Sequence, residues 1–159
     1  MTAISTPETK DGAYIVVAQR DQYILKDIED RIYSDSPNHV FCTTNPDLAL
    51  KEVVDNAVDM VVTGQIFSGP GIKDGDSLAG EIYGVKPDVL TLRYSITPSW
   101  VRREVIGDIP KIPSENHQTL VDLLNSPDLG EILGERDWLR LRETFPYIRF
   151  HDSLERLHQ

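Results

Sequence analysis

Almost wholly apolar runs recur along the chain, and stretches with a helical pattern separate them. Short apolar runs bounded by turn residues predict strands that are buried on both faces of a sheet. The five predicted strands cover residues 13–18, 39–44, 59–63, 89–95 and 108–112.

The segments between these runs carry helix start signals and apolar residues at helical spacing. Asp21 is placed to cap a helix that continues to Ile32, and Asn45-Pro46-Asp47 combines a cap with a proline at the first helical position. The further predicted helices are 76–83, a weak helix at 98–106, and 115–124 capped by Ser114.

Alternating strands and helices predict an α/β protein with a doubly wound, five-stranded parallel sheet covered on both sides. We assign residues 1–12 to a flexible N-terminus, 13–125 to this domain and 126–159 to a helical C-terminal extension. The extension is predicted to form two helical segments separated by Pro146. The first segment carries an apolar stripe that is expected to pack against another surface. The stripe consists of Ile132, Leu133, Trp138, Leu141 and Phe145.

Charge and hydropathy exclude several partners. The chain carries a formal net charge of −10, so its overall charge does not attract nucleic acid or anionic lipid. No apolar run approaches the roughly 20 residues that span a bilayer. The polar N-terminus lacks a secretion signal, so we expect a cytoplasmic protein.

Catalytic and metal-binding motifs are not found. The single cysteine, Cys42, lies in an apolar run and is expected to be a buried structural thiol. The four histidines lack metal-ligand spacing, and the stretch 68–73 lacks the Gly-Lys-Ser/Thr ending of a phosphate loop. We therefore expect no enzymatic activity, no cofactor and no metal.

In parallel sheets the functional residues gather where the strands end. The residues at these positions are Ala18, Gln19, Gly64, Ser95 and Lys111. The stretch from DMVVTG (59–64) through DGDSLAGEIYGVKPDVLTLRYS (74–95) resembles the response-regulator receiver domain, which has the CheY-like, flavodoxin-type fold. The resemblance extends over roughly residues 13–125.

This resemblance implies a defective phosphorylation site. The family holds magnesium with two acids after the first strand, and here these positions are Ala18 and Gln19. Its phosphoacceptor aspartate corresponds to Gly64, whereas its hydroxyl and lysine are retained as Ser95 and Lys111. A pseudo-receiver that cannot be phosphorylated and acts by binding proteins in signal transduction or regulation is the function that we expect.

Two other interpretations remain open. An acid elsewhere can restore the chemistry: Asp21 or Asp59 for a metal, and Asp74 or Asp76 for a relocated phosphoacceptor in the 64–76 loop. Alternatively, the chain is an acidic scaffold component that pairs with a basic partner.

Partner contacts are expected on two surfaces. The segment from Ser95 to Lys111 is shorter than in the family, which predicts a truncated or irregular fourth helix and a changed output face. The extension either docks on its own domain or builds a homodimer, as can the 98–125 face. The side chains that we nominate for partner contacts are Trp100, Arg103, Trp138 and Leu141.

Overall fold

The computed structural model describes residues 12–96, 101–112 and 115–158. Residues 1–11 of the predicted flexible N-terminus, the predicted cap Ser114 and the partner candidate Trp100 lie outside the described residues. The sheet has the strand order β2-β1-β3-β4-β5-β6. Its strands are β1 (Tyr14–Ala18), β2 (His39–Thr43), β3 (Met60–Thr63), β4 (Leu90–Ser95), β5 (Gly107–Pro110) and β6 (Arg149–Phe150).

The five strands β1 to β5 pair in parallel, which confirms the predicted α/β class and the parallel core of the sheet. The predicted number of strands is too small by one. The two-residue strand β6 pairs antiparallel with β5 at the edge of the sheet. It is too short to show an alternating pattern, so the sequence did not reveal it.

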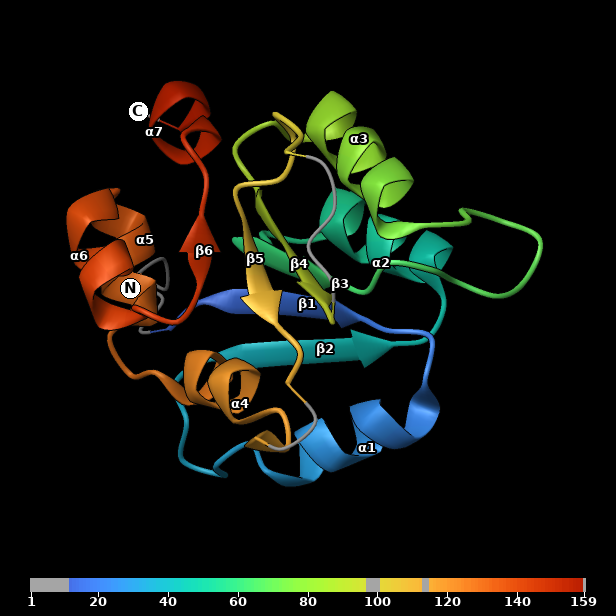
Figure 1. Cartoon of the computed structure of the whole chain (residues 1–159), viewed down its shortest axis with the longest axis horizontal. Coiled ribbons are helices and arrows are strands. Elements are labelled where there is room, and N and C mark those ends of the chain that lie inside the picture. The colour runs from blue at the N-terminus through green and yellow to red at the C-terminus, as the bar shows by residue number, and fades with distance from the viewer. Residues whose placement is uncertain (1–11, 97–100, 113–114, 159) are drawn as a thin grey trace, which may run out of the picture.

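Seven helices surround the sheet in the described part of the chain (Figure 1). Four of them belong to the α/β domain: α1 (Gln22–Asp30), α2 (Pro46–Asp55), α3 (Gly75–Val85) and α4 (Gln118–Asn125). The other three form the C-terminal extension: α5 (Leu129–Glu135), α6 (Trp138–Thr144) and α7 (Ser153–Leu157).

Alternate strand residues supply two separate hydrophobic layers, as the two-residue repeat of a strand requires. Ile15 and Val17 of β1 belong to the cluster that includes α1 and α4. Val16 and Ala18 belong to the other cluster, with α2 and α3. Figure 1 shows these two pairs of helices on opposite faces of the sheet. The doubly wound arrangement therefore follows from apolar strands that pack on both sides.

Two of the predicted helix caps, Asp21 and Asn45, are present in the structure. The helix predicted to begin at residue 115 instead begins at Gln118, with His117 at its N-cap position. The Asp21 carboxylate accepts hydrogen bonds from the backbone N–H groups of Tyr23 and Ile24 and so begins α1. Asn45 accepts from Asp47 N–H and Leu48 N–H at the start of α2. These bonds satisfy N–H groups that have no partner inside the helix.

Helix α3 begins at a close approach between two backbone segments. Asp74 caps it by accepting from Ser77 N–H at 2.7 Å, and Gly75 N–H donates to Gln65 O at 2.9 Å. A Cβ atom at Gly75 would lie 2.1 Å from Gly64 O. Only glycine fits there, and this contact joins the start of α3 to the end of β3.

The predicted weak helix between β4 and β5 is wrong in the described residues 101–106, which contain no helix. On this side of the sheet β4 and β5 carry buried polar side chains instead of apolar ones: Thr91, Arg93, Ser95 and Asp108. An apolar helix face packed on these polar side chains would bury little apolar strand surface, so a helix gains little there.

Arg93 is the centre of a buried charge network. Its side chain is 1% exposed, and Nε lies 2.8 Å from Asp108 Oδ1 while Nη1 lies 3.1 Å from Asp76 Oδ1 of α3. Asp108 Oδ2 also lies 2.9 Å from His151 Nε2. Burial opposes the guanidinium charge, but Asp108 and Asp76 outweigh it and raise the Arg93 pKa. The network joins β4, β5, α3 and the extension.

The extension docks on its own domain. Its apolar residues share one hydrophobic cluster with β1, β3 and β4, and Ser153 Oγ donates to Val105 O at 2.9 Å. The first predicted helical segment is divided into α5 and α6, because Arg136 adopts a left-handed conformation with φ of 53°. The members of the cluster from this region are Leu129, Ile132, Leu141, Phe145, Ile148 and Leu154.

Replacing Gly75 by alanine is expected to destabilise the fold by about 2 kcal/mol or more, because backbone at Gly64 cannot move away cheaply. Gly80 lies in the same helix, and a Cβ atom there would meet no other atom within 4 Å. Gly80→Ala is expected to stabilise by about 0.5–1 kcal/mol through helix propensity. Urea unfolding of both variants measures the difference; equal effects of the two substitutions would contradict the close approach.

Asp108→Asn removes the negative charge of one Arg93 partner, while the guanidinium of Arg93 stays charged and buried. We expect a loss of about 3 kcal/mol in the free energy of unfolding. The matched control is Asp55→Asn, which breaks the exposed pair with Lys51 and is expected to leave the free energy of unfolding almost unchanged. Chemical unfolding followed by circular dichroism gives both values, and a cost for Asp108→Asn no larger than the control would disprove the role of the network.

Candidate degenerate phosphorylation site

The strand register brings the predicted site residues to one edge of the sheet. Ala18 pairs with Thr63 of β3, so Gln19 and Gly64 follow side by side. Gly64 N–H donates to Ala18 O at 2.8 Å, and Lys111 N–H donates to Ser95 O at 2.9 Å. A hollow of about 170 Å³ at this edge is lined by Gln19, Ser95 and Lys111 among others.

The side chain of Gln19 fills the space beside Gly64. A Cβ atom on Gly64 would lie 3.0 Å from Gln19 Oε1 and 3.1 Å from Gln19 Nε2. Gln19 is 7% exposed, so its amide is held inside the site. Gly64, which is predicted to correspond to the phosphoacceptor, has no nucleophilic side chain, and a neutral amide packs against its backbone.

The charges that line the hollow are positive. Arg20 and Lys111 are its charged residues, and the remaining polar lining comes from neutral side chains such as Gln19, Gln65 and Ser95. Burial lowers the pKa of Lys111; nearby Arg20 lowers it further, whereas Asp21 opposes the shift. A divalent cation prefers carboxylate oxygens, so this hollow is unsuited to magnesium.

The acids that could replace the missing groups have other contacts. Asp21 caps α1, and Asp74 caps α3. Asp76 forms an ion pair with Arg93. Asp59 Oδ2 accepts from Tyr14 N–H at 2.9 Å, at the start of β3 rather than at its end. Within residues 12–96, 101–112 and 115–158, no three His, Cys, Asp or Glu side chains form a cluster that could hold a metal ion.

The partner candidates that the structure describes differ in their exposure. Leu141 is fully buried in the core, so it offers nothing to a partner. Arg103 is exposed, with its guanidinium carbon 5.2 Å from the centre of the Tyr83 ring. Trp138 is half-buried in the extension, and its indole Nε1 donates to His158 O at 2.8 Å.

Cys42 is only half-buried, so its thiol is less buried than predicted. Cys42 is the second-last residue of β2, the strand at one edge of the sheet. Part of its side chain is exposed because no strand pairs with β2 on its outer side. Burial, and secondarily Glu29, raises the pKa of its thiol to about 12. The thiolate is therefore disfavoured, and Cys42 is a poor nucleophile.

Sequence reasoning missed the Arg93 network and two exposed tyrosines, Tyr33 and Tyr147. An arginine inside the apolar run VLTLRYS was a usable signal, because a charge in a buried strand requires a partner. The tyrosines gave no such signal, because their exposure depends on where the connecting loops lie in the fold.

No family model and no curated protein matches the sequence. Among solved structures, the response regulator RcsB of Salmonella typhimurium superposes with a TM-score of 0.58 and 12% identity, over 93% of this chain and 67% of that chain. The signal receiver domain of an HD domain-containing protein from Pseudomonas fluorescens Pf-5 gives a TM-score of 0.57 and 17% identity, over 83% of this chain and 98% of that chain.

The non-phosphorylated receiver domain of the stress response regulator RcsB from Escherichia coli gives a TM-score of 0.54 and 13% identity, over 70% of this chain and 92% of that chain. The fold is that of response-regulator receiver domains, which confirms the resemblance found in the sequence. No helix in the described part of the chain combines the length and the apolar character of a membrane span.

Two histidines make stability depend on pH. Burial, and secondarily Lys111, lowers the pKa of His117, whose Nδ1 is hydrogen-bonded to the Tyr94 hydroxyl. Burial lowers the pKa of His158; Asp88 opposes this shift and Arg136 adds to it. The unfolded chain therefore binds these protons more readily than the folded chain does.

The free energy of unfolding is thus expected to fall as pH decreases through about 6.5, because the unfolded histidines take up protons first. In the double variant His117→Gln/His158→Gln this part of the slope should vanish. Urea unfolding between about pH 7.5 and 5 measures it. An unchanged slope in the double variant would contradict the assignment.

Proposed function

We propose that this chain is a receiver-like domain that does not accept phosphate and acts by binding another protein in a signal-transduction or regulatory pathway. Receiver-domain neighbours in the structure comparison support the signalling context. The observation that carries the loss of phosphorylation is Gly64, with the Gln19 amide packed against it.

Phosphorylation of a receiver forms a bond between a carboxylate oxygen and phosphorus while the donor's leaving group departs. Gly64 offers no oxygen for this bond. Receivers also use a metal ion, held by carboxylates, that neutralises the phosphoryl oxygens, and the hollow is lined by Arg20 and Lys111 rather than by acids. Ser95 and Lys111 keep their places but have no acyl phosphate to contact.

What the fold retains supports a protein-binding role. Receivers transmit a signal through their surface, and this chain keeps the fold while the segment between β4 and β5 and the added extension change that surface. We infer a protein partner or a second copy of this chain in the cytoplasm, and neither an enzymatic activity nor a cofactor. The acidic charge makes a basic partner the natural one.

The test is intact-mass spectrometry after incubation with magnesium and acetyl phosphate. We expect no phosphoryl adduct, and no shift in thermal melting with magnesium and beryllofluoride. The matched variants are Asp74→Asn and Asp76→Asn. A stoichiometric adduct on the wild-type chain that disappears in one of them would overturn the proposal and identify that aspartate as a relocated acceptor.

A further inference from the structure

Two adjoining hollows lie along the outer side of α4. One has a volume of about 380 Å³ and the other about 440 Å³, and both are lined by Thr119, Asp122 and Tyr147. We call the surface that they form together the α4 groove. Helix α4 itself lies on the opposite side of the sheet from α2 and α3 (Figure 1).

The groove is built jointly by the α/β domain and the extension. Tyr33 comes from the connection between α1 and β2, and its N–H donates to Asn125 Oδ1 at 2.9 Å, at the end of α4. Tyr147 comes from the connection between α6 and β6, between the buried side chains of Phe145 and Ile148. Both tyrosines therefore project from backbone that is anchored to the core.

The lining is aromatic and rich in proline. The Tyr33 and Tyr147 side chains are 64% and 77% exposed, although each belongs to the groove. Pro127 and Pro146 line the same hollow. Exposed, anchored tyrosines are typical of protein contact sites, because a rigid ring gains contact area with little loss of conformational entropy.

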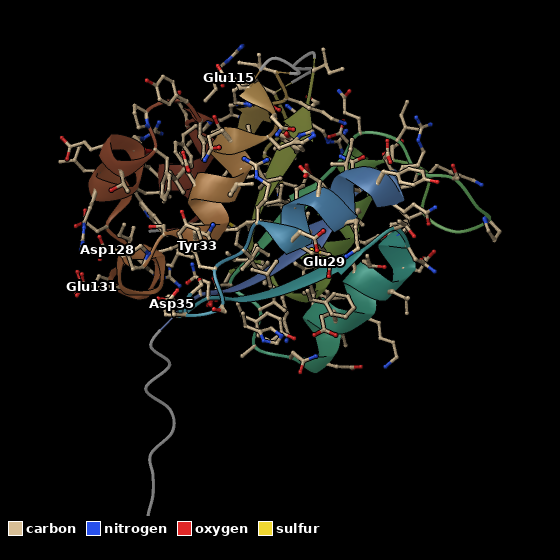
Figure 2. All side chains as sticks on the ribbon, turned by 90° about the horizontal axis from the view of Figure 1, so that it is seen from below. Glu29, Tyr33, Asp35, Glu115, Asp128 and Glu131 are labelled. Atoms are coloured by element: carbon tan, nitrogen blue, oxygen red, sulfur yellow. The ribbon has the colours of Figure 1, made fainter. Side chains whose placement is uncertain are left out.

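The charges of the groove are acidic. Glu115 and Asp122 are the charged residues among its lining residues. Figure 2 shows Glu115 near one end of α4 and Tyr33 near the other, with Asp35 and Asp128 on the same side as Tyr33. The guanidinium of Arg31 contacts α4 but is already engaged, because it donates to Gln118 Oε1 at 2.7 Å and pairs with Asp27.

We propose that the α4 groove binds an extended, arginine- and proline-containing segment of a partner protein. A guanidinium group stacks on a tyrosine ring and pairs with a carboxylate through two hydrogen bonds, whereas an ammonium group does neither as well. Proline in an extended segment packs on aromatic rings and loses little entropy on binding. The groove offers both kinds of surface, next to each other.

The dimensions suit a short peptide. Helix α4 has eight residues and is about 12 Å long, which corresponds to about four residues of extended chain. A second copy of this chain fits poorly, because each copy carries a net charge of −10. Nucleic acid is repelled by the same acids.

This inference rests on the proposed protein-binding function, and it names the partner's chemistry. The experiment uses the full chain and a fluorescein-labelled octapeptide of alternating arginine and proline, with fluorescence anisotropy at low and moderate salt. Tyr33→Ala/Tyr147→Ala is expected to weaken binding about tenfold. Glu115→Gln/Asp122→Asn is expected to weaken it about as much and to flatten the salt dependence.

Two controls separate the groove from general charge attraction. Glu81→Gln/Glu135→Gln removes the same charge from exposed sites that do not line the groove, and Tyr23→Ala removes a ring that is 77% exposed elsewhere. Both should leave affinity within about twofold. Equal weakening by the controls, or no binding of the peptide, would overturn the groove proposal. A phosphoryl adduct on the same sample would overturn the proposed function instead, whatever the peptide does.

Discussion

The buried guanidinium of Arg93 is the interaction on which the arrangement of the rest of the molecule depends. A charge with 1% exposure is tolerated only where carboxylates surround it, and Asp108 and Asp76 supply them from β5 and α3. Asp108 in turn binds His151, which follows β6. One charge thus ties the middle of the sheet to a helix on one face and to the C-terminal extension.

This network also accounts for the unusual surface of the domain. The polar side chains of β4 and β5 do not suit an apolar helix, and the described residues between these strands, 101–106, form none. The extension supplies β6 at the free edge of β5 and apolar side chains to the core on the other face. In that position it also provides Tyr147, which completes the α4 groove. The docked extension therefore contributes both the strand at the edge of the sheet and one wall of the α4 groove.

The α/β class, the parallel core and several helix starts could be predicted because they depend on neighbours in sequence. Apolar runs such as 13–18 predict buried strands. Asp21 and Asn45 cap helices by accepting hydrogen bonds from N–H groups two and three residues further along the chain. The positions of Gln19, Gly64, Ser95 and Lys111 at one edge followed from the resemblance to receivers. Strand β6, the break at Arg136 and the burial of Leu141 could not be predicted, because each depends on where the extension packs.

The sequence by itself determined that position 64 carries no carboxylate: glycine has no side chain in any fold, and no packing can supply one there. Only the tertiary structure decided what takes its place. The Gln19 amide lies against Gly64 because β1 and β3 are paired in register, and the two cations at the hollow meet because strands distant in sequence end at the same edge. Local order is encoded in adjacent residues, whereas a site or a groove is made by residues that only the folded sheet and its docked extension bring together.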